Sequence, residues 1–115
     1  MSIDNLTDLE ICKRIADIEE LNPHMSQCNK YVMVEVDCMN SVVIRHTEYN
    51  PLTDDALCFS LLKKFDIDLL SPYRPNGDVN WEAQLFTKDN IEISNIYDIN
   101  PNKAICLAII EAHNG

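Results

Sequence analysis

The chain has 115 residues, of which 46% are hydrophobic and 24% are charged, a profile typical of one compact domain over residues 1–115. Its 19 acidic and 9 basic residues give a formal net charge of −10. This charge disfavours direct binding to nucleic acid or to an anionic membrane, since both attract proteins through lysine and arginine. With no run of about 18 apolar residues and no signal-peptide pattern at the start, we expect a cytoplasmic protein.

The first predicted helix begins at a capping box. In Thr7-Asp8-Leu9-Glu10, the Thr7 hydroxyl can accept a backbone N–H while the Glu10 carboxylate reaches back to that of Thr7. Apolar residues then recur at helical spacing, at Ile11, Ile15 and Ile18. Asn22-Pro23 is expected to end the helix, because a residue before proline avoids the helical region.

Two β-branched runs follow and predict an antiparallel hairpin. Tyr31–Val36 alternates valines with larger or charged side chains, which is typical of a strand with one apolar face. Val42–His46 supplies the second strand, and Asp37–Ser41 fits the turn between them.

A second helix is predicted to start at Asn50-Pro51, because asparagine caps helices and proline is favoured at their first position. It continues to about Phe65. Ile67–Leu70 fits either a short strand or a packed tail, and Ser71–Asp78 is a loop by its proline, asparagine and glycine content.

The last third of the chain predicts a second hairpin and a third helix. Trp81–Leu85 and Ile91–Ile93 alternate, with Lys88-Asp89-Asn90 as the turn. Asn100-Pro101 repeats the helix start, and Ala104–Ile110 is apolar on every side. Such a helix must be covered, either by the sheet and the other helices or by a second copy, and we expect a homodimer through it.

The order of helix, hairpin, helix, loop, hairpin and helix predicts an α+β fold. We expect one antiparallel four-stranded sheet, built from the two hairpins and packed with three helices in the manner of an α/β/α sandwich.

Catalysis is not expected, and no metal or cofactor is expected either. A phosphate-binding loop needs several glycines, and the chain has 2. The 5 cysteines include no C-x-x-C pair. A thiol- or metal-dependent enzyme would need at least three side chains to converge from the set His24, Cys28, Cys38 and His46.

Binding is the alternative, because an acidic protein is steered toward basic surfaces while exposed aromatic and arginine side chains supply affinity. The expected partner is therefore a protein with a basic surface. The candidate binding residues are Tyr49, Asp54, Asp55, Asp66, Asp68, Tyr73, Arg74 and Asp78. In a rival hypothesis the proline-rich loop around Arg74 closes over a small anion, in a cavity that Tyr73 and Trp81 also line.

Four segments of the chain carry a family resemblance, namely Tyr49–Asp55, Leu61–Ile67, Trp81–Ala83 and Asn100–Ala108. They resemble small phage and prophage proteins of the NinX-like and bacteriophage ABA-sandwich families, over residues 7–113. The resemblance implies an α/β/α sandwich around an antiparallel sheet, encoded by a phage accessory gene. If the chain comes from a phage, its small size, its acidity and the lack of a catalytic constellation predict a non-catalytic inhibitor of a defence or nucleic-acid-handling machine in the host cytoplasm. Its negative charge would then mimic nucleic acid.

Overall fold

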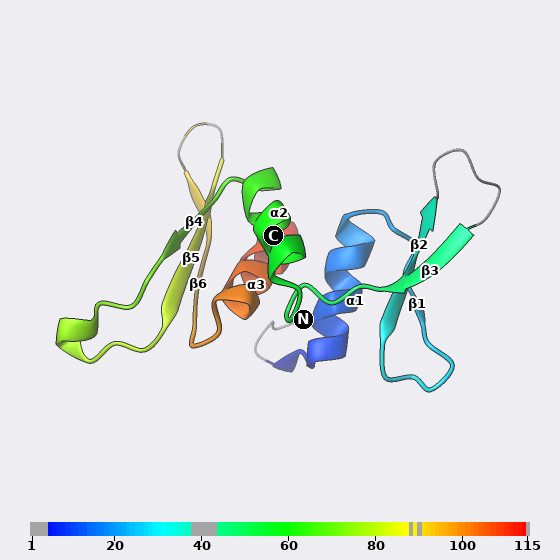
Figure 1. The fold of residues 1–115 in the computed structure, drawn as a ribbon. Helices are drawn as coiled ribbons and strands as arrows, with labels where there is room; N and C mark the ends of the chain where they lie inside the picture. The colour runs from blue at the N-terminus through cyan, green and yellow to red at the C-terminus, as the bar shows by residue number, and fades with distance from the viewer. Residues whose placement is uncertain (1–4, 38–43, 88, 90, 115) are drawn as a thin grey trace. The chain divides into compact units, whose positions relative to one another are not determined.

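The computed structural model describes residues 5–37, 44–87, 89 and 91–114, which fall into two compact units, Ser2–Asn50 and Pro51–Gly115 (Figure 1). Each unit has its own three-stranded antiparallel sheet. The prediction of one four-stranded sheet is therefore wrong. Each predicted hairpin pairs with a nearby third strand of its own unit rather than with the other hairpin. That the whole chain forms one domain stays a prediction.

In the unit Ser2–Asn50, helix α1 spans Asp8–Ile18 and begins at the predicted capping box. The backbone N–H of Glu10 donates to the Thr7 hydroxyl at 3.2 Å, and the backbone N–H of Thr7 donates to the Glu10 carboxylate at 3.5 Å. The helix ends earlier than expected from Asn22-Pro23, because the backbone already turns into the left-handed region at Glu20, where φ is 58°.

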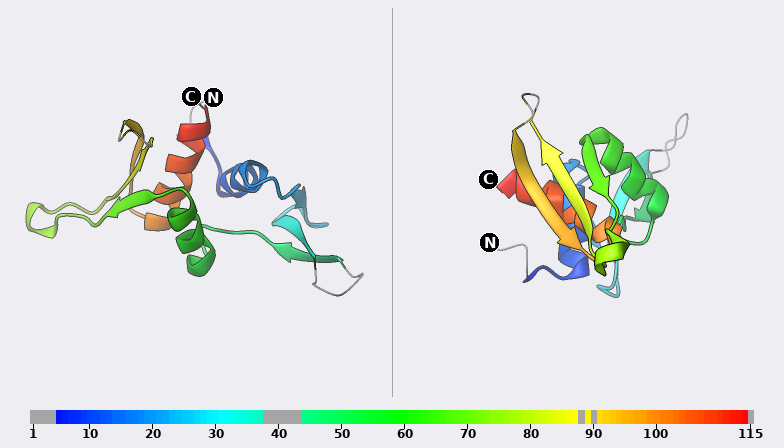
Figure 2. Two further views of the ribbon diagram at one scale, coloured as in Figure 1. Left: turned by 90° about the horizontal axis from the view of Figure 1, so that it is seen from above. Right: turned by 90° about the vertical axis from the view of Figure 1, so that its left-hand side faces the viewer.

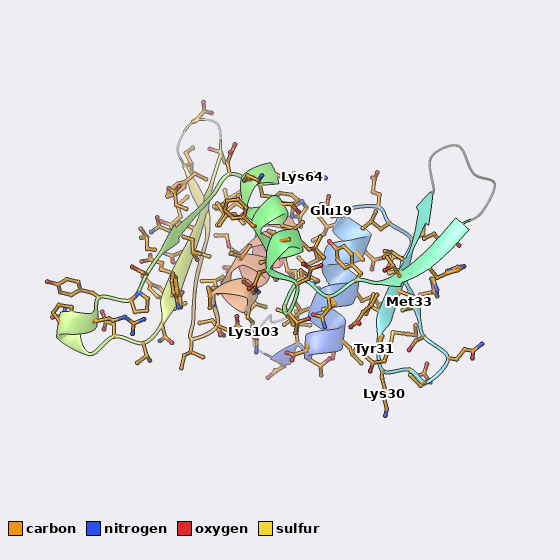
Figure 3. The ribbon with its side chains drawn as sticks, in the orientation of Figure 1. Glu19, Lys30, Tyr31, Met33, Lys64 and Lys103 are labelled. Carbon is orange, nitrogen blue, oxygen red and sulfur yellow. The ribbon has the colours of Figure 1, made fainter. Side chains whose placement is uncertain are left out.

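The sheet of this unit has the order β1-β2-β3, with β1 at His24–Met25, β2 at Val32–Asp37 and β3 at Ile44–Glu48. Its central pair confirms the first predicted hairpin. The buried valines of β2 face α1, which packs against this strand. Tyr31 lies just before β2 (Figure 3). Its side chain is 46% exposed. The predicted turn Asp37–Ser41 lies almost entirely outside the described residues.

In the unit Pro51–Gly115, helix α2 spans Asp55–Lys64, so its predicted start at Asn50-Pro51 is wrong. Asp54 is the cap instead, and its Oδ1 accepts the backbone N–H of Leu57 at 3.1 Å. An aspartate here adds a negative charge at the positive end of the helix. The Asn50 side chain is directed elsewhere and donates to the Glu48 carboxylate at 3.4 Å.

The sheet of this unit has the order β4-β5-β6, with β4 at Ile67–Leu70, β5 at Trp81–Phe86 and β6 at Glu92–Asp98. The second predicted hairpin is confirmed, and of the two alternatives for Ile67–Leu70 the strand is correct. Between β4 and β5 lies a 3-10 helix, η2, at Arg74–Asn76. Gly77 closes η2 with φ 76°, a conformation that suits glycine. Of the predicted turn Lys88-Asp89-Asn90, only Asp89 is described.

Helix α3 spans Pro101–Asn114 and starts where Asn100-Pro101 predicted it. The Asn100 Oδ1 accepts the backbone N–H groups of Asn102 at 3.0 Å and Lys103 at 3.4 Å. Residues Ala104–Ile110 are all buried, none more than 7% exposed. The helix packs across β5 and β6 and contacts α2 and β4 (Figure 2).

This burial bears on the expected homodimer. The expectation rested on an apolar helix surface that the chain itself does not cover, and the seven side chains of Ala104–Ile110 are instead covered within the chain. A dimer through α3 stays a prediction, and its contacts would have to come from other side chains of the helix. In the part of the chain that is described, no helix has both the length and the apolar character needed to cross a bilayer.

Candidate functional site

The sheet β4-β5-β6 has one buried face and one open face. The side chains of Ile67, Ala83 and Ile96 are buried. On the opposite face, Leu70 of β4 lies opposite Glu82 of β5, which lies opposite Tyr97 of β6. The three side chains form a row across the sheet because residues paired across antiparallel strands point to the same face.

Hydrogen bonds hold the Glu82 carboxylate in place within this row. Its Oε2 accepts the Tyr97 hydroxyl at 3.0 Å and the Gln84 Nε2 amide at 2.8 Å. The hydrogen bond to Glu82 is the main cause that raises the pKa of the Tyr97 hydroxyl above its ordinary value, followed by desolvation and then by the negative charge of Glu82. Both bonds use one carboxylate oxygen. Within the described residues, Oε1 of Glu82 has no hydrogen-bond partner.

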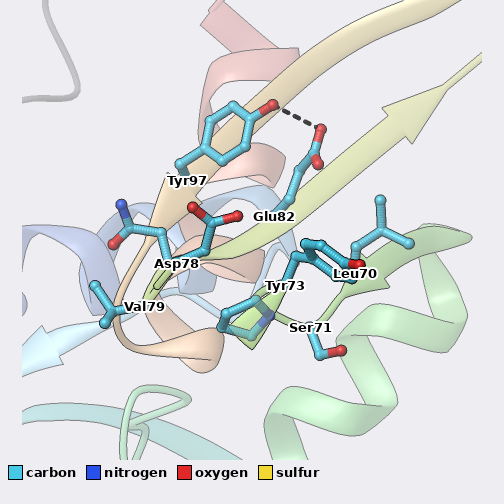
Figure 4. A pocket seen from close by; sticks show the side chains of 9 residues that line it. Leu70, Ser71, Tyr73, Asp78, Val79, Glu82 and Tyr97 are labelled. Carbon is cyan, nitrogen blue, oxygen red and sulfur yellow. Dashed lines mark hydrogen bonds between the residues drawn. The ribbon is translucent and has the colours of Figure 1, made fainter. Parts of the chain in front are cut away.

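A cavity of about 310 Å³ lies between this row and the connection from β4 to β5, residues 71–80 (Figure 4). We call it the Glu82 cavity. It is lined by Leu70, Ser71, Pro72, Tyr73, Asp78, Val79, Asn80, Glu82 and Tyr97. Tyr73 and Tyr97 are each 60% exposed, so both rings are accessible to a partner.

The lining of the Glu82 cavity favours a cation. It contains two tyrosine rings and two carboxylates, Asp78 and Glu82, and none of its nine residues is basic. The rival hypothesis of an anion-binding cavity expected Arg74, Tyr73 and Trp81 together. Of these, only Tyr73 lines the cavity, and carboxylates stand where an anion would need positive charge.

A second, more apolar hollow of about 460 Å³ lies where α2 and α3 meet the sheet. Phe59, Leu69 and Trp81 are among its lining residues, and Phe59 is 58% exposed. At its rim the Asp55 Oδ1 accepts the Asn102 side-chain amide at 2.8 Å. This bond ties the start of α2 to the start of α3, so Asp55 has a structural role there.

The other predicted aspartates lie elsewhere in the same unit. Asp66 and Asp68 are both exposed and line a third hollow of about 360 Å³, beside Lys63. The backbone of Asp66 is left-handed, with φ 52°, as it leaves α2. Asp54 is engaged as the cap of α2.

The predicted binding residues that are aromatic or arginine differ in exposure and in whether they line the cavity. Tyr73 lines the Glu82 cavity together with Asp78. Arg74 is exposed on η2 but does not line that cavity. Tyr49 is only 5% exposed, so the expectation that it is an exposed binding aromatic is wrong. Its backbone N–H donates to the Val32 carbonyl at 2.8 Å, which continues the pairing of β2 with β3 and sets Tyr49 opposite the buried Val32.

Sequence reasoning missed Glu82 and Tyr97, which carry most of the cavity's chemistry. Alternation in β5 does predict that Glu82 points away from the core. The register that sets it opposite Tyr97, with a bulge between Leu85 and Phe86, has no signal in the sequence. The sequence therefore indicated the cavity residues on the connection 71–80 but not those on the sheet, Glu82 and Tyr97.

The groups considered for thiol or metal chemistry do not assemble into a site in the described part of the chain. The His24 and His46 rings meet edge to face, with centroids 5.0 Å apart. Within residues 5–37, 44–87, 89 and 91–114, no three His, Cys, Asp or Glu side chains lie close enough to hold a metal ion. Cys28 is exposed, and Cys38 lies outside the described residues.

Buried thiols instead serve packing between helices. Cys58 of α2 is buried, and its Sγ donates to the Asn102 carbonyl of α3 at 3.8 Å. A hydrogen bond from the Cys106 side chain lowers the pKa of the Cys58 thiol, against the opposing effects of burial and nearby aspartates. These contacts join α2 to α3.

No protein-family model, no curated protein and no solved structure matches this chain. The resemblance to the NinX-like and ABA-sandwich phage proteins therefore stays a prediction.

Proposed function

We propose that this protein acts without catalysis, by binding a partner protein at a basic surface of that partner. The observation that carries the proposal is the Glu82 cavity, whose lining combines two exposed tyrosines with two carboxylates and has no basic residue. Aromatic side chains contribute much of the binding energy at protein interfaces, and charge complementarity raises association rates.

The charge of the whole chain supports the same proposal. A formal net charge of −10 on 115 residues produces a field that attracts positively charged surfaces. This attraction weakens as salt is added, since exposed charges further apart than about 8–10 Å are screened at physiological ionic strength. The Glu82 cavity would then provide short-range contacts that salt weakens less.

The family resemblance suggests which partner to look for. If the chain is a phage accessory protein, its partner is a host protein that handles nucleic acid or defends the cell, and binding inhibits that protein in the host cytoplasm. Proteins that bind nucleic acid expose the lysine and arginine clusters that an acidic surface would cover.

The test is affinity capture from a bacterial lysate, at low and at moderate salt, with mass spectrometry to identify what is retained. We compare the wild-type chain with Asp78→Asn/Glu82→Gln and with a matched control, Asp17→Asn/Glu20→Gln. The control removes the same two charges from exposed sites of the other unit. We expect a basic protein to be retained by the wild type and the control, and largely lost by the cavity variant. Retention of nothing at either salt concentration would contradict the proposal.

A further inference from the structure

We propose that the Glu82 cavity binds a guanidinium group, and that in the complex this group is an arginine side chain of the partner. The inference rests on the proposed function for the source of the arginine. The cavity itself can be tested without any partner. Carboxylates alone would mark only a hydrated surface, but this cavity also has two aromatic rings and apolar side chains in its lining.

The size of the cavity fits one side chain. At about 310 Å³ it lies at the lower end of the range of about 300–1,000 Å³ seen for pockets that hold small molecules. Two of its lining rings, Tyr73 and Tyr97, are exposed, so a side chain can reach them from outside. An arginine reaching in from a protein surface needs such access, since its backbone stays outside.

The carboxylates are arranged for a donor with several N–H groups. Glu82 is fixed through Oε2 by Tyr97 and Gln84, so Oε1 can accept a further bond with little loss of side-chain entropy. The Asp78 carboxylate, which the connection 71–80 contributes to the cavity, has no hydrogen-bond partner within the described residues (Figure 4). A guanidinium carries five N–H donors in a planar fork and can serve both groups at once.

The rings and apolar walls favour guanidinium over ammonium. A planar guanidinium stacks on aromatic faces and is more weakly hydrated than the ammonium of lysine, so moving it against the Tyr73 or Tyr97 ring costs less desolvation. Leu70, Pro72 and Val79 provide the apolar surface on which an aliphatic stem can lie.

The experiment uses the full chain and small probes. Nα-acetyl-arginine amide is titrated while amide NMR signals are followed, and the neutral citrulline and cationic lysine analogues are titrated in parallel. We expect saturable shifts at Leu70, Glu82 and Tyr97 with the arginine probe, at a dissociation constant on the order of millimolar. The citrulline probe should give no saturable shift, and the lysine probe should bind more weakly.

The variants locate the site. Asp78→Asn/Glu82→Gln should weaken the arginine probe by about tenfold or more, which corresponds to about 1.4 kcal/mol. The control Asp17→Asn/Glu20→Gln should bind it as the wild type does. Amide NMR spectra of both variants show whether the fold is kept. If the cavity variant does not fold, Tyr73→Ala, which truncates an exposed ring, replaces it and should also weaken binding.

Three outcomes would overturn the inference: no saturable shift with the arginine probe, equal binding of the lysine probe, or shifts spread over acidic residues of both units. The two proposals fail separately. Arginine binding in the cavity without any captured protein would count against the proposed function alone. A protein captured equally by the cavity variant would show that the overall charge suffices, and that the cavity does not take the partner's arginine.

Discussion

The two units build similar parts into different surfaces. Each has a three-stranded antiparallel sheet with a helix against it, but the connections beside the central strands differ. In the first unit, residues 26–31 close on themselves, as the Ser26 backbone N–H donates to the Tyr31 carbonyl at 2.9 Å. In the second unit, the longer connection 71–80 contains η2 and forms one side of the Glu82 cavity.

The two units also differ in how much of a helix surface is buried. In α1, the buried residues Ile11, Cys12, Ile15 and Ala16 form one stripe, and charged residues occupy the other side. In α3, Ala104–Ile110 are buried on every side. The second unit therefore covers one whole helix, α3, in its core and leaves one sheet face and one long connection available for binding.

The largest expected effect is the loss of stability when one core side chain is shortened in each unit. Ile15 of α1 and Ile109 of α3 are both fully buried, so Ile15→Ala and Ile109→Ala should each lower the free energy of unfolding by about 2–5 kcal/mol. Hydrogen exchange followed by mass spectrometry should accelerate mainly in the unit that carries the change. Equal acceleration in both units would show that they unfold as one cooperative body, as the single-domain prediction implies.

The next largest effect is the loss of stability when the cap of α1 or of α2 is removed. Thr7→Ala and Asp54→Ala each remove a side chain that accepts a backbone N–H at the start of a helix. Each should lower the free energy of unfolding by about 1 kcal/mol, measured by urea denaturation. The control Thr53→Ala changes an exposed residue beside the second cap and should stay within about 0.5 kcal/mol. An equally large loss in this control would show that the Asp54 bond is not the cause.

A smaller effect distinguishes the exposed thiol of the first unit from the buried ones. Cys28 is exposed, and its pKa is lowered chiefly by a hydrogen bond with the Ser26 hydroxyl, at 3.4 Å. A thiol reagent followed by peptide mapping should therefore modify Cys28 well before Cys58 or Cys106, which react only after local opening. Ser26→Ala should slow the reaction modestly near neutral pH, because it raises the pKa and reduces the thiolate fraction. Faster labelling of Cys58 would contradict the burial of α2 against α3.

The smallest effect concerns the pKa of Tyr97 in the cavity. Glu82→Gln keeps an acceptor but removes the charge, so the Tyr97 pKa should fall toward its ordinary value. Because the native pKa is raised, the bond contributes its full stability below the ordinary tyrosine pKa and loses it as pH rises through the raised one. An NMR pH titration of the Tyr97 ring measures this shift.

The matched control for that titration is Glu92→Gln. Glu92 raises the Tyr97 pKa only through its charge, and it is the smallest of the causes. Its replacement should therefore lower the pKa less than the Glu82 change does. An equal decrease of the Tyr97 pKa in the two variants would mean that the Tyr97 hydroxyl does not donate to Glu82. The described arrangement of these two side chains in the cavity would then be wrong.

Local signals in the sequence determined the starts of α1 and α3, the existence of both hairpins and the loop that carries Tyr73 and Asp78. These features depend on residues close together in the chain, such as Thr7 with Glu10 or Asn100 with Asn102. The competition between Asn50 and Asp54 for the cap of α2 was also local, but both residues are good caps and only the folded chain selected one.

Only the tertiary structure decided that the hairpins belong to separate sheets, that Tyr49 is buried, and that Glu82 lies between Leu70 and Tyr97. Alternation assigns a side chain to a face of a strand, but it does not say which strand comes next or in what register. Those choices are made by packing among segments far apart in the chain, whose combined free energy no single stretch of sequence contains.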